Sequence, residues 1–305
     1  KPFSNPLRLK MSVRASLISF FLRRTVKKTM SNFVEPISLR ARFSSSPKKL
    51  SAEVMSERVE SGGVSGSWLW KKNADTSKIV LYLHGGGYVF GGYGSHGEIA
   101  SEMANIVGGR ALLLEYRLAP EHPFPAAFND ALFSYRWLLE KGYKSEDIFL
   151  AGDSAGGGLA VSLLLALKKN GLPLPKAVCL FSPWVDLTCA AASIDSNALS
   201  DCMLSPGALK RFRKHYLGEA DPLDERASPI FGDLSGLPPT YVAVGGEEIL
   251  LDDSKQLVTK IRSFGGRAEL SIWHKMPHVF PIFSSVIPEG RLALKEFASF
   301  RDAHA

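Results

Sequence analysis

Ser154 is the residue of this chain with the clearest potential for chemistry. It lies at the centre of Gly-Asp-Ser-Ala-Gly at residues 152–156, a G-x-S-x-G pattern. An apolar run at 148–151 enters the pattern and a long helix-forming stretch leaves it, so the sequence predicts a strand, a sharp turn and a helix. The flanking glycines leave room for strand and helix, and the turn lifts the serine hydroxyl clear of the sheet. The pattern therefore predicts a serine nucleophile.

A second glycine-rich string, His-Gly-Gly-Gly at residues 84–87, follows an apolar run of strand length. Glycines can present backbone N–H groups without obstruction, and such donors stabilise the oxyanion of a tetrahedral intermediate by on the order of 3 kcal/mol each. We expect the N–H groups of Gly86, Gly87 and Ala155 to form this oxyanion hole. A phosphate-binding loop would need a helix that starts at the glycines and a lysine, and residues 88–92 supply neither.

A serine nucleophile needs a base, and in a strand-turn-helix setting of this kind the order along the chain is serine, acid, histidine. Five of the seven histidines belong to the glycine string, precede Ser154, sit in a predicted cap or end the chain: His84, His96, His122, His215 and His304. His274 directly abuts the last strand, whereas His278 lies in a loop that can fold back over the strand ends. We favour His278 as the base and regard His274 as a partly buried strand-end residue.

The acid that orients the base should follow the strand before the last, where four carboxylates compete: Glu247, Glu248, Asp252 and Asp253. Asp252 and Asp253 stand where first-turn helix acids are favoured by the helix dipole, whether or not they are catalytic. Glu247 and Glu248 stand where the strand has just ended and the chain must turn. Asp153, inside the serine turn, is better explained by local hydrogen bonding.

The elements that would position these residues alternate between strands and helices. Apolar runs of strand length occur at 78–83, 111–116, 148–151, 177–182, 241–245 and 268–273, and helical patterns at 126–141, 252–264 and 289–300. Such alternation predicts an α/β fold with a mostly parallel sheet covered by helices on both faces. Two short alternating runs within 58–70, separated by Gly62 and Gly63, predict an antiparallel hairpin at the edge of the sheet.

The alternation fails in an insertion at residues 186–238, where a helical pattern at 193–216 has no strand partner. We expect this insertion, with N-terminal helices in residues 1–50, to cap the carboxyl ends of the strands, where open α/β sheets bind their ligands. The catalytic domain would then comprise residues 51–185 and 239–305. The substrate cavity should lie between the cap and the nucleophile, with these candidate lining residues: Tyr88, Phe90 and Trp184.

The net charge of +7 comes from the N-terminal segment alone. Residues 1–50 hold twelve of the 37 Lys and Arg residues and one of the 30 Asp and Glu residues, so this segment carries +11 and residues 51–305 sum to −4. Its apolar run, 17–22, is far shorter than the roughly 20 residues that span a membrane. We expect an amphipathic helix that packs its apolar face on the protein and solvates its basic face. Binding to a membrane surface is the alternative.

Residues 1–10 precede Met11, and we expect them to be a tag or an upstream remnant outside the fold. The three cysteines, Cys179, Cys189 and Cys202, are odd in number and lack metal-ligand spacing, which favours a cytoplasmic protein without disulfides. We expect no metal, no organic cofactor and no nucleic-acid partner.

Several blocks together resemble the hormone-sensitive lipase family of α/β-hydrolase carboxylesterases. They are HGGG at residue 84, YRLAPEHPFPA at residue 116, GDSAGG at residue 152 and the loop that contains His278. The resemblance runs from about residue 50 to the end, and bacterial members with N-terminal cap helices are especially similar. It implies an α/β-hydrolase fold with a helical cap, and family members often form homodimers through the edge strand near the C-terminus.

The resemblance also bears on the acid. In the family the acid is usually the first Asp of D-P-L-x-D, which falls on Glu248 in this sequence, with Asp252 at the last position. This chain departs from the pattern by having Glu where the family has Asp. The resemblance therefore favours Glu248 as the acid, with Asp252 as the runner-up.

The residues and the resemblance together predict a serine carboxylesterase. Ser154 would attack the ester carbonyl, His278 would accept its proton and Glu248 would hold the imidazole. The capped, aromatic site and the family favour ester substrates with short- to medium-chain acyl groups. A lactone or amide hydrolase would use the same groups. A non-catalytic small-molecule receptor on the same fold is the third interpretation, which the presence of the histidine disfavours.

Overall fold

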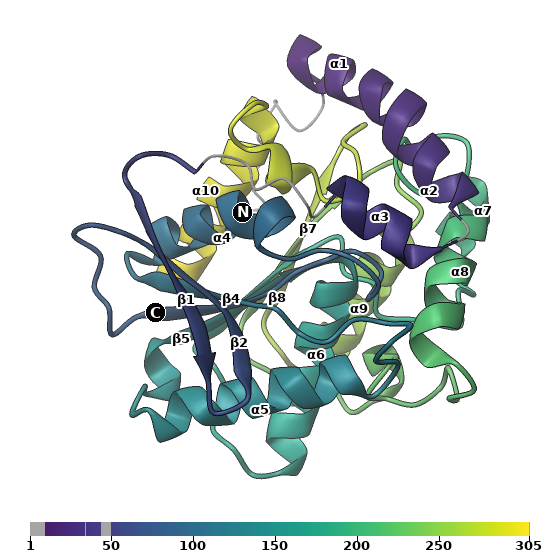
Figure 1. Cartoon of the computed structure of the whole chain (residues 1–305). Coiled ribbons are helices and arrows are strands. Elements are labelled where there is room, and N and C mark those ends of the chain that lie inside the picture. The colour runs from purple at the N-terminus through teal and green to yellow at the C-terminus, as the bar shows by residue number, and fades with distance from the viewer. Residues whose placement is uncertain (1–9, 34, 44–49, 305) are drawn as a thin grey trace.

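The protein is built around an eight-stranded sheet with helices on both faces (Figure 1). The computed structural model describes residues 10–33, 35–43 and 50–304, so the segment predicted as a tag, residues 1–10, lies outside the described residues except for Lys10. The strand order is β1-β2-β4-β3-β5-β6-β7-β8. The strands span β1 Val54–Ser61, β2 Val64–Lys71, β3 Ile79–Leu83, β4 Arg110–Leu114, β5 Ile148–Asp153, β6 Ala177–Phe181, β7 Thr240–Gly245 and β8 Ala268–Trp273.

Strands β3 to β8 run parallel, while β2 is antiparallel to both β1 and β4. The predicted hairpin is therefore confirmed, and Gly62 and Gly63 form its turn. Every residue of β3, β5, β6 and β7 is buried. These strands have continuous apolar sequences because helices cover both faces of the sheet. The predicted α/β fold class is confirmed.

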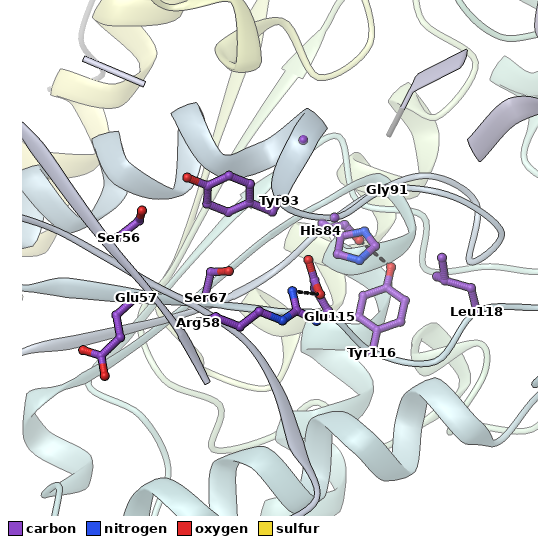
Figure 2. A pocket seen from close by; sticks show the side chains of 12 residues that line it. Ser56, Glu57, Arg58, Ser67, His84, Gly91, Tyr93, Glu115, Tyr116 and Leu118 are labelled. Carbon is purple, nitrogen blue, oxygen red and sulfur yellow. Dashed lines mark hydrogen bonds and ion pairs between the residues drawn. The ribbon is translucent and has the colours of Figure 1, made fainter. Parts of the chain in front are cut away.

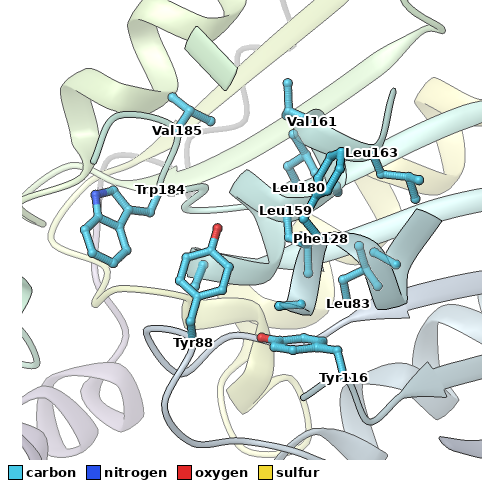
Figure 3. Close-up of a cluster of buried hydrophobic side chains, with 14 of the residues drawn as sticks. Leu83, Tyr88, Tyr116, Phe128, Leu159, Val161, Leu163, Leu180, Trp184 and Val185 are labelled. Atoms are coloured by element: carbon cyan, nitrogen blue, oxygen red, sulfur yellow. The ribbon is translucent and has the colours of Figure 1, made fainter. Parts of the chain in front are cut away.

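Two groups of helices cover the two faces of the sheet. One face carries α4 (Tyr93–Val107) and α10 (Pro288–Asp302), and the other carries α5 (Ala126–Glu140), α6 (Ser154–Lys169) and α9 (Leu251–Ser263). Figure 3 shows part of the second layer, where Leu159 of α6 lies among sheet residues such as Leu83 and Leu180. The helices predicted at 126–141, 252–264 and 289–300 are confirmed as α5, α9 and α10, with ends that differ by at most two residues.

The turn between β5 and α6 requires glycine for a steric reason. A Cβ atom at Gly156 would lie 2.1 Å from the carbonyl oxygen of Leu83, and one at Gly152 would lie 2.5 Å from the carbonyl oxygen of Gly156. Ser154 itself has a φ of 51°, in the left-handed region that costs energy for a residue with a side chain. The close packing of helix on strand therefore holds Ser154 in the predicted sharp turn.

Two distant parts of the chain supply the remaining helices. The N-terminal part forms α1 (Val13–Leu22), the π-helical η2 (Arg23–Lys27), α2 (Lys28–Asn32) and α3 (Pro36–Phe43), and the insertion forms α7 (Ala192–Ser196) and α8 (Pro206–Leu217). The helical pattern at 193–216 is thus two helices, because Ser205 accepts a hydrogen bond from the N–H of Ala208 and caps a new helix. Figure 1 shows α2 beside α8.

The N-terminal helix departs from the prediction. α1 buries Ala15 and Leu22, but Leu17, Phe20 and Phe21 remain exposed. The expectation that the apolar face would pack on the protein was wrong for these residues. The physical reason is that apolar side chains occupy more than one side of this helix, and only one side can contact the body of the protein.

Candidate active site

Three predicted site residues meet at the carboxyl ends of parallel strands. Ser154 follows β5, Glu248 follows β7 and His278 lies in the loop after β8. The Nε2 atom of His278 is 2.9 Å from Ser154 Oγ, and its Nδ1 atom is 3.4 Å from Glu248 Oε2. The second distance suits an ion pair, but the geometry is not that of a hydrogen bond, since Nδ1 has no hydrogen-bond partner among the described residues. The arrangement can pass a proton from serine to histidine beside a carboxylate.

Burial and neighbouring charges set the acid–base properties of this cluster. Burial raises the pKa of Glu248, and the nearby His278 and the hydrogen bond from Ser182 offset this only in part. Burial by itself would lower the pKa of His278, but the carboxylate of Glu248, with contributions from Asp201 and Asp153, raises it instead. The imidazole is therefore well suited to accept a proton and hold it next to a negative charge.

Ser182 links the acid to the histidine loop, and sequence reasoning missed it. It is fully buried directly after β6. Its Oγ donates to Glu248 Oε2 at 2.9 Å and accepts from the N–H of Val279 at 3.0 Å. One hydroxyl thus positions the carboxylate and the loop that carries the base. The sequence signal that could have identified Ser182 is its position, a polar residue at the carboxyl end of an apolar strand. The predicted catalytic residues also follow the carboxyl ends of strands.

The runner-up acid and its neighbour have other partners. Asp252 Oδ2 accepts from the N–H of Ser193 at 3.0 Å, and its Oδ1 pairs with Lys255 at 3.0 Å. Asp253 accepts from two backbone N–H groups of the segment after β6, and burial raises the pKa of Asp253 to about 8. Among the described contacts of these two carboxylates, none is to His278, so Glu248 is the acid that the fold brings beside it.

Asp153 holds the glycine string in place. Its Oδ1 accepts from the N–H of Gly85 and from the hydroxyl of Tyr82, both at 3.0 Å. Its Oδ2 lies 3.3 Å from His96 Nε2. Burial opposes the charged form of Asp153, but the attraction of His96 and the hydrogen bonds outweigh it, so the pKa of Asp153 is lowered. Local hydrogen bonding is the role that the sequence predicted for Asp153.

The predicted oxyanion residues lie next to Ser154. Gly86 and Gly87 line the cavity that contains Ser154, and Ala155 is buried in the first turn of α6. Gly87 has a φ of 59°, and a Cβ atom there would lie 2.6 Å from the ring of Phe212 on α8. The absence of a side chain therefore lets α8 approach the glycine string closely.

A cavity of about 350 Å³ lies above Ser154. Two of the predicted lining residues, Phe90 and Trp184, line it, but Tyr88 does not. The ring of Tyr88 stacks on Tyr216 at 3.6 Å between centroids, and Figure 3 shows it in the buried cluster near Trp184. Tyr88 therefore supports the wall from behind. Both parts of the predicted cap contribute to the lining, through Leu22, Val26, Met30, Phe43, Met203, Leu204, Leu209 and Phe212.

A second cavity, of about 570 Å³, borders the glycine string at His84 alone (Figure 2). Its walls include Tyr93 and an ion pair in which Arg58 Nη1 lies 2.6 Å from Glu115. His84 reaches this cavity and stacks on Tyr116, and burial lowers the pKa of His84 to about 3. Although this cavity is larger, no described serine in its walls bonds to an imidazole, so it lacks the arrangement found at Ser154.

Among the described residues, no cluster of three or more His, Cys, Asp and Glu side chains could hold a metal ion. Within the same residues, no helix has both the length and the apolar character needed to cross a membrane. Burial raises the pKa of all three free thiols, so none of them competes with Ser154 as an anionic nucleophile: Cys179, Cys189 and Cys202.

Comparison with known proteins supports the fold. Residues 80–282 match the family model of the alpha/beta hydrolase fold. An acetyl-hydrolase from Streptomyces hygroscopicus is 41% identical over 242 residues, which cover 79% of this chain and 81% of the relative. The solved structure of an esterase from the bacterial hormone-sensitive lipase family has a TM-score of 0.89 at 37% identity, covering 97% of this chain and 99% of that one.

A further solved structure, of EstE5 soaked with p-nitrophenyl butyrate, has a TM-score of 0.91 at 36% identity and covers 96% of this chain and 99% of that one. The family match spans well over half of the chain, and the relatives are similar along most of their own length. The chain therefore belongs to the α/β-hydrolase family, and within it to the hormone-sensitive lipase group of carboxylic ester hydrolases.

Proposed function

We propose that Ser154, His278 and Glu248 act as a triad that hydrolyses carboxylic esters through an acyl-enzyme. The observation that carries this proposal is the 2.9 Å contact between His278 Nε2 and Ser154 Oγ. A serine hydroxyl is a weak nucleophile until a base takes its proton, and this contact supplies the base. A receptor without catalysis would gain nothing from a buried imidazole at this distance with a carboxylate 3.4 Å behind it.

The mechanism follows from these positions. Ser154 Oγ attacks the ester carbonyl while His278 Nε2 takes its proton, and the N–H groups of Gly86, Gly87 and Ala155 stabilise the oxyanion by about 3 kcal/mol per donor. His278 then gives the proton to the leaving alcohol, and the acyl group stays on Ser154. Water attacks this acyl-enzyme while His278 Nε2 takes a proton from it. The imidazolium then returns this proton to Ser154 Oγ as the bond to the acyl group breaks and the carboxylic acid leaves.

The cavity supports a preference for short- to medium-chain acyl groups. Its volume of about 350 Å³ and its largely apolar lining suit a small apolar group. Phe90, Trp184 and Phe212 contribute bulky rings to the wall, which limits the length of chain that fits. A short-chain ester, p-nitrophenyl butyrate, was the molecule soaked into crystals of the related EstE5.

Two measurements test the proposal separately. The first is intact-mass analysis after treatment with a fluorophosphonate, which should add one phosphonyl group to the wild type and none to Ser154→Ala. The second is kcat/KM for p-nitrophenyl esters from acetate to palmitate, which should be highest among the short and medium chains. Labelling of Ser154→Ala would contradict the nucleophile, and a maximum at the long end would contradict the acyl preference.

A further inference from the structure

The outer side of α1 carries an apolar stripe that the rest of the described chain leaves uncovered. Val13, Leu17, Phe20 and Phe21 are 76%, 55%, 48% and 61% exposed. Their spacing of three and four residues places them on one side of the helix. Figure 1 shows α1 at the periphery of the molecule. Single exposed apolar residues are ordinary, whereas four neighbours on one helix side indicate a contact surface.

Positive charge accompanies this stripe. Arg14 and Arg24 are exposed, and the guanidinium of Arg24 lies 4.0 Å over the ring of Phe20. By contrast, Arg23 and Lys27 donate to backbone carbonyls of the insertion and so fasten the helix to the protein. No Asp or Glu occurs in residues 1–34. The stripe is therefore bordered by cations without a carboxylate from its own segment.

We propose that this outer face of α1 seats the enzyme on an anionic lipid surface. The apolar side chains would enter the boundary between headgroups and acyl chains, while Arg14 and Arg24 would pair with anionic headgroups. A second copy of the chain suits the face less well, because symmetric pairing of two α1 helices would bring these cations together. The inference goes beyond ester hydrolysis and does not depend on the proposed triad.

The opposite side of the same helical segment forms part of the wall above Ser154. Leu22, Val26 and Met30 line the 350 Å³ cavity, and they belong to α1, η2 and α2, which follow one another without a break. The lipid-facing and substrate-facing sides are thus two sides of one helical run. An enzyme seated in this way would have its cavity wall close to esters that partition into the lipid.

Co-sedimentation of the full chain with vesicles tests the proposal. The vesicles are equimolar phosphatidylcholine and phosphatidylglycerol in one arm and phosphatidylcholine alone in the other. Each arm is run at about 0.1 M and about 1 M salt, between which the screening length falls from about 10 Å to about 3 Å. We expect binding to the anionic vesicles at the lower salt, weaker binding at the higher salt, and weaker binding to phosphatidylcholine alone.

Variants of the stripe and matched controls make the test specific. Phe21→Ser should weaken binding about tenfold, and Leu17→Ser combined with Phe21→Ser about a hundredfold. Arg14→Gln combined with Arg24→Gln should weaken binding to the anionic vesicles about fivefold per charge and reduce the salt dependence. Phe133→Ser should leave binding unchanged, because Phe133 is 45% exposed on α5, which Figure 1 shows far from α1.

Three outcomes would overturn the proposal. They are a wild type that fails to bind anionic vesicles at the lower salt, equal losses in Phe21→Ser and Phe133→Ser, and full binding by the double apolar variant. Light scattering tests for a fourth outcome. A dimeric wild type and a monomeric double apolar variant would assign the face to a second copy of the chain. Thermal unfolding should show that the variants are folded. Because the assay does not use catalysis, a failure of the proposed triad leaves its result interpretable.

Discussion

Two buried carboxylate–imidazole pairs lie close to Ser154, and they differ in what the imidazole reaches. Asp153 is 3.3 Å from His96, and Glu248 is 3.4 Å from His278. The side chains of both pairs are at most 6% exposed. His278 directs Nε2 to Ser154 Oγ at 2.9 Å, whereas His96 directs Nδ1 to a neighbouring serine, at 2.8 Å. Both pairs join a buried carboxylate to a buried imidazole, so the pairs differ in the group that the second ring nitrogen contacts.

The two carboxylates also differ in how well they are hydrogen-bonded. Asp153 has donors on both oxygens, and the pKa of Asp153 is lowered in spite of its burial. Glu248 has a buried Oε1 without a hydrogen-bond partner among the described residues, and burial raises the pKa of Glu248. A carboxylate with hydrogen-bond donors on both oxygens holds a loop in place. A carboxylate with one oxygen that accepts no hydrogen bond can respond to the positive charge that develops on a neighbouring histidine.

Removing each imidazole should produce the largest difference between the pairs. His278→Ala is expected to lower kcat/KM by about 10⁵-fold or more, because it removes the base beside Ser154. His96→Ala should lower kcat/KM by no more than about tenfold, since His96 acts through Asp153 and the glycine string. Steady-state kinetics with p-nitrophenyl butyrate measure both values. Losses of similar size would mean that both pairs serve the reaction.

Replacing each carboxylate by its amide should give the next largest difference. Glu248→Gln is expected to lower kcat by about 10³- to 10⁴-fold, because the imidazolium loses its countercharge. Asp153→Asn should stay within about tenfold of the wild type, since the amide oxygen can still accept from the glycine string. Asp252→Asn is the matched control on the same segment and should be close to the wild type. A greater loss in Asp252→Asn than in Glu248→Gln would reassign the acid.

The hydroxyl that supports the second pair should have a smaller effect. Ser182→Ala is expected to lower kcat by about tenfold to a hundredfold with little change in KM, because Glu248 and the N–H of Val279 each lose a hydrogen bond. Ser162→Ala is the control, since Ser162 is buried and its Oγ has no hydrogen-bond partner among the described residues. If both variants keep full kcat, Ser182 has no positioning role.

The pH dependence should show the smallest but most direct difference. The base must be neutral to accept a proton, so kcat/KM rises with pH through the pKa of His278. Because Glu248 raises this pKa above its ordinary 6.5, the acid limb of the wild type should lie above that pH. Glu248→Gln leaves the effect of burial less opposed and should move the limb to lower pH. Asp153→Asn should move the acid limb in the same direction but by less. An acid limb that stays in place in Glu248→Gln would contradict the effect of Glu248 on the pKa of His278.

Most of the fold could be predicted from the spacing of apolar residues and from the turn-forming residues between elements. The parallel strands are buried on both faces, so they appear in the sequence as apolar runs that few other structures produce. Element ends were less predictable, because local capping decides them. The strand expected at 111–116 ends at Leu114, and the helical pattern at 193–216 breaks where Ser205 caps a new helix.

The sequence by itself determined the class of fold, the turn that carries Ser154 and the choice of His278 as candidate base. The residues alone left the acid open, and the family resemblance favoured Glu248. Only the tertiary structure placed Ser182 between Glu248 and the loop that carries His278, kept Tyr88 out of the cavity lining and left one side of α1 uncovered. Motifs and order along the chain report local backbone geometry, whereas these features depend on which side chains from distant elements meet, and chain spacing does not specify that.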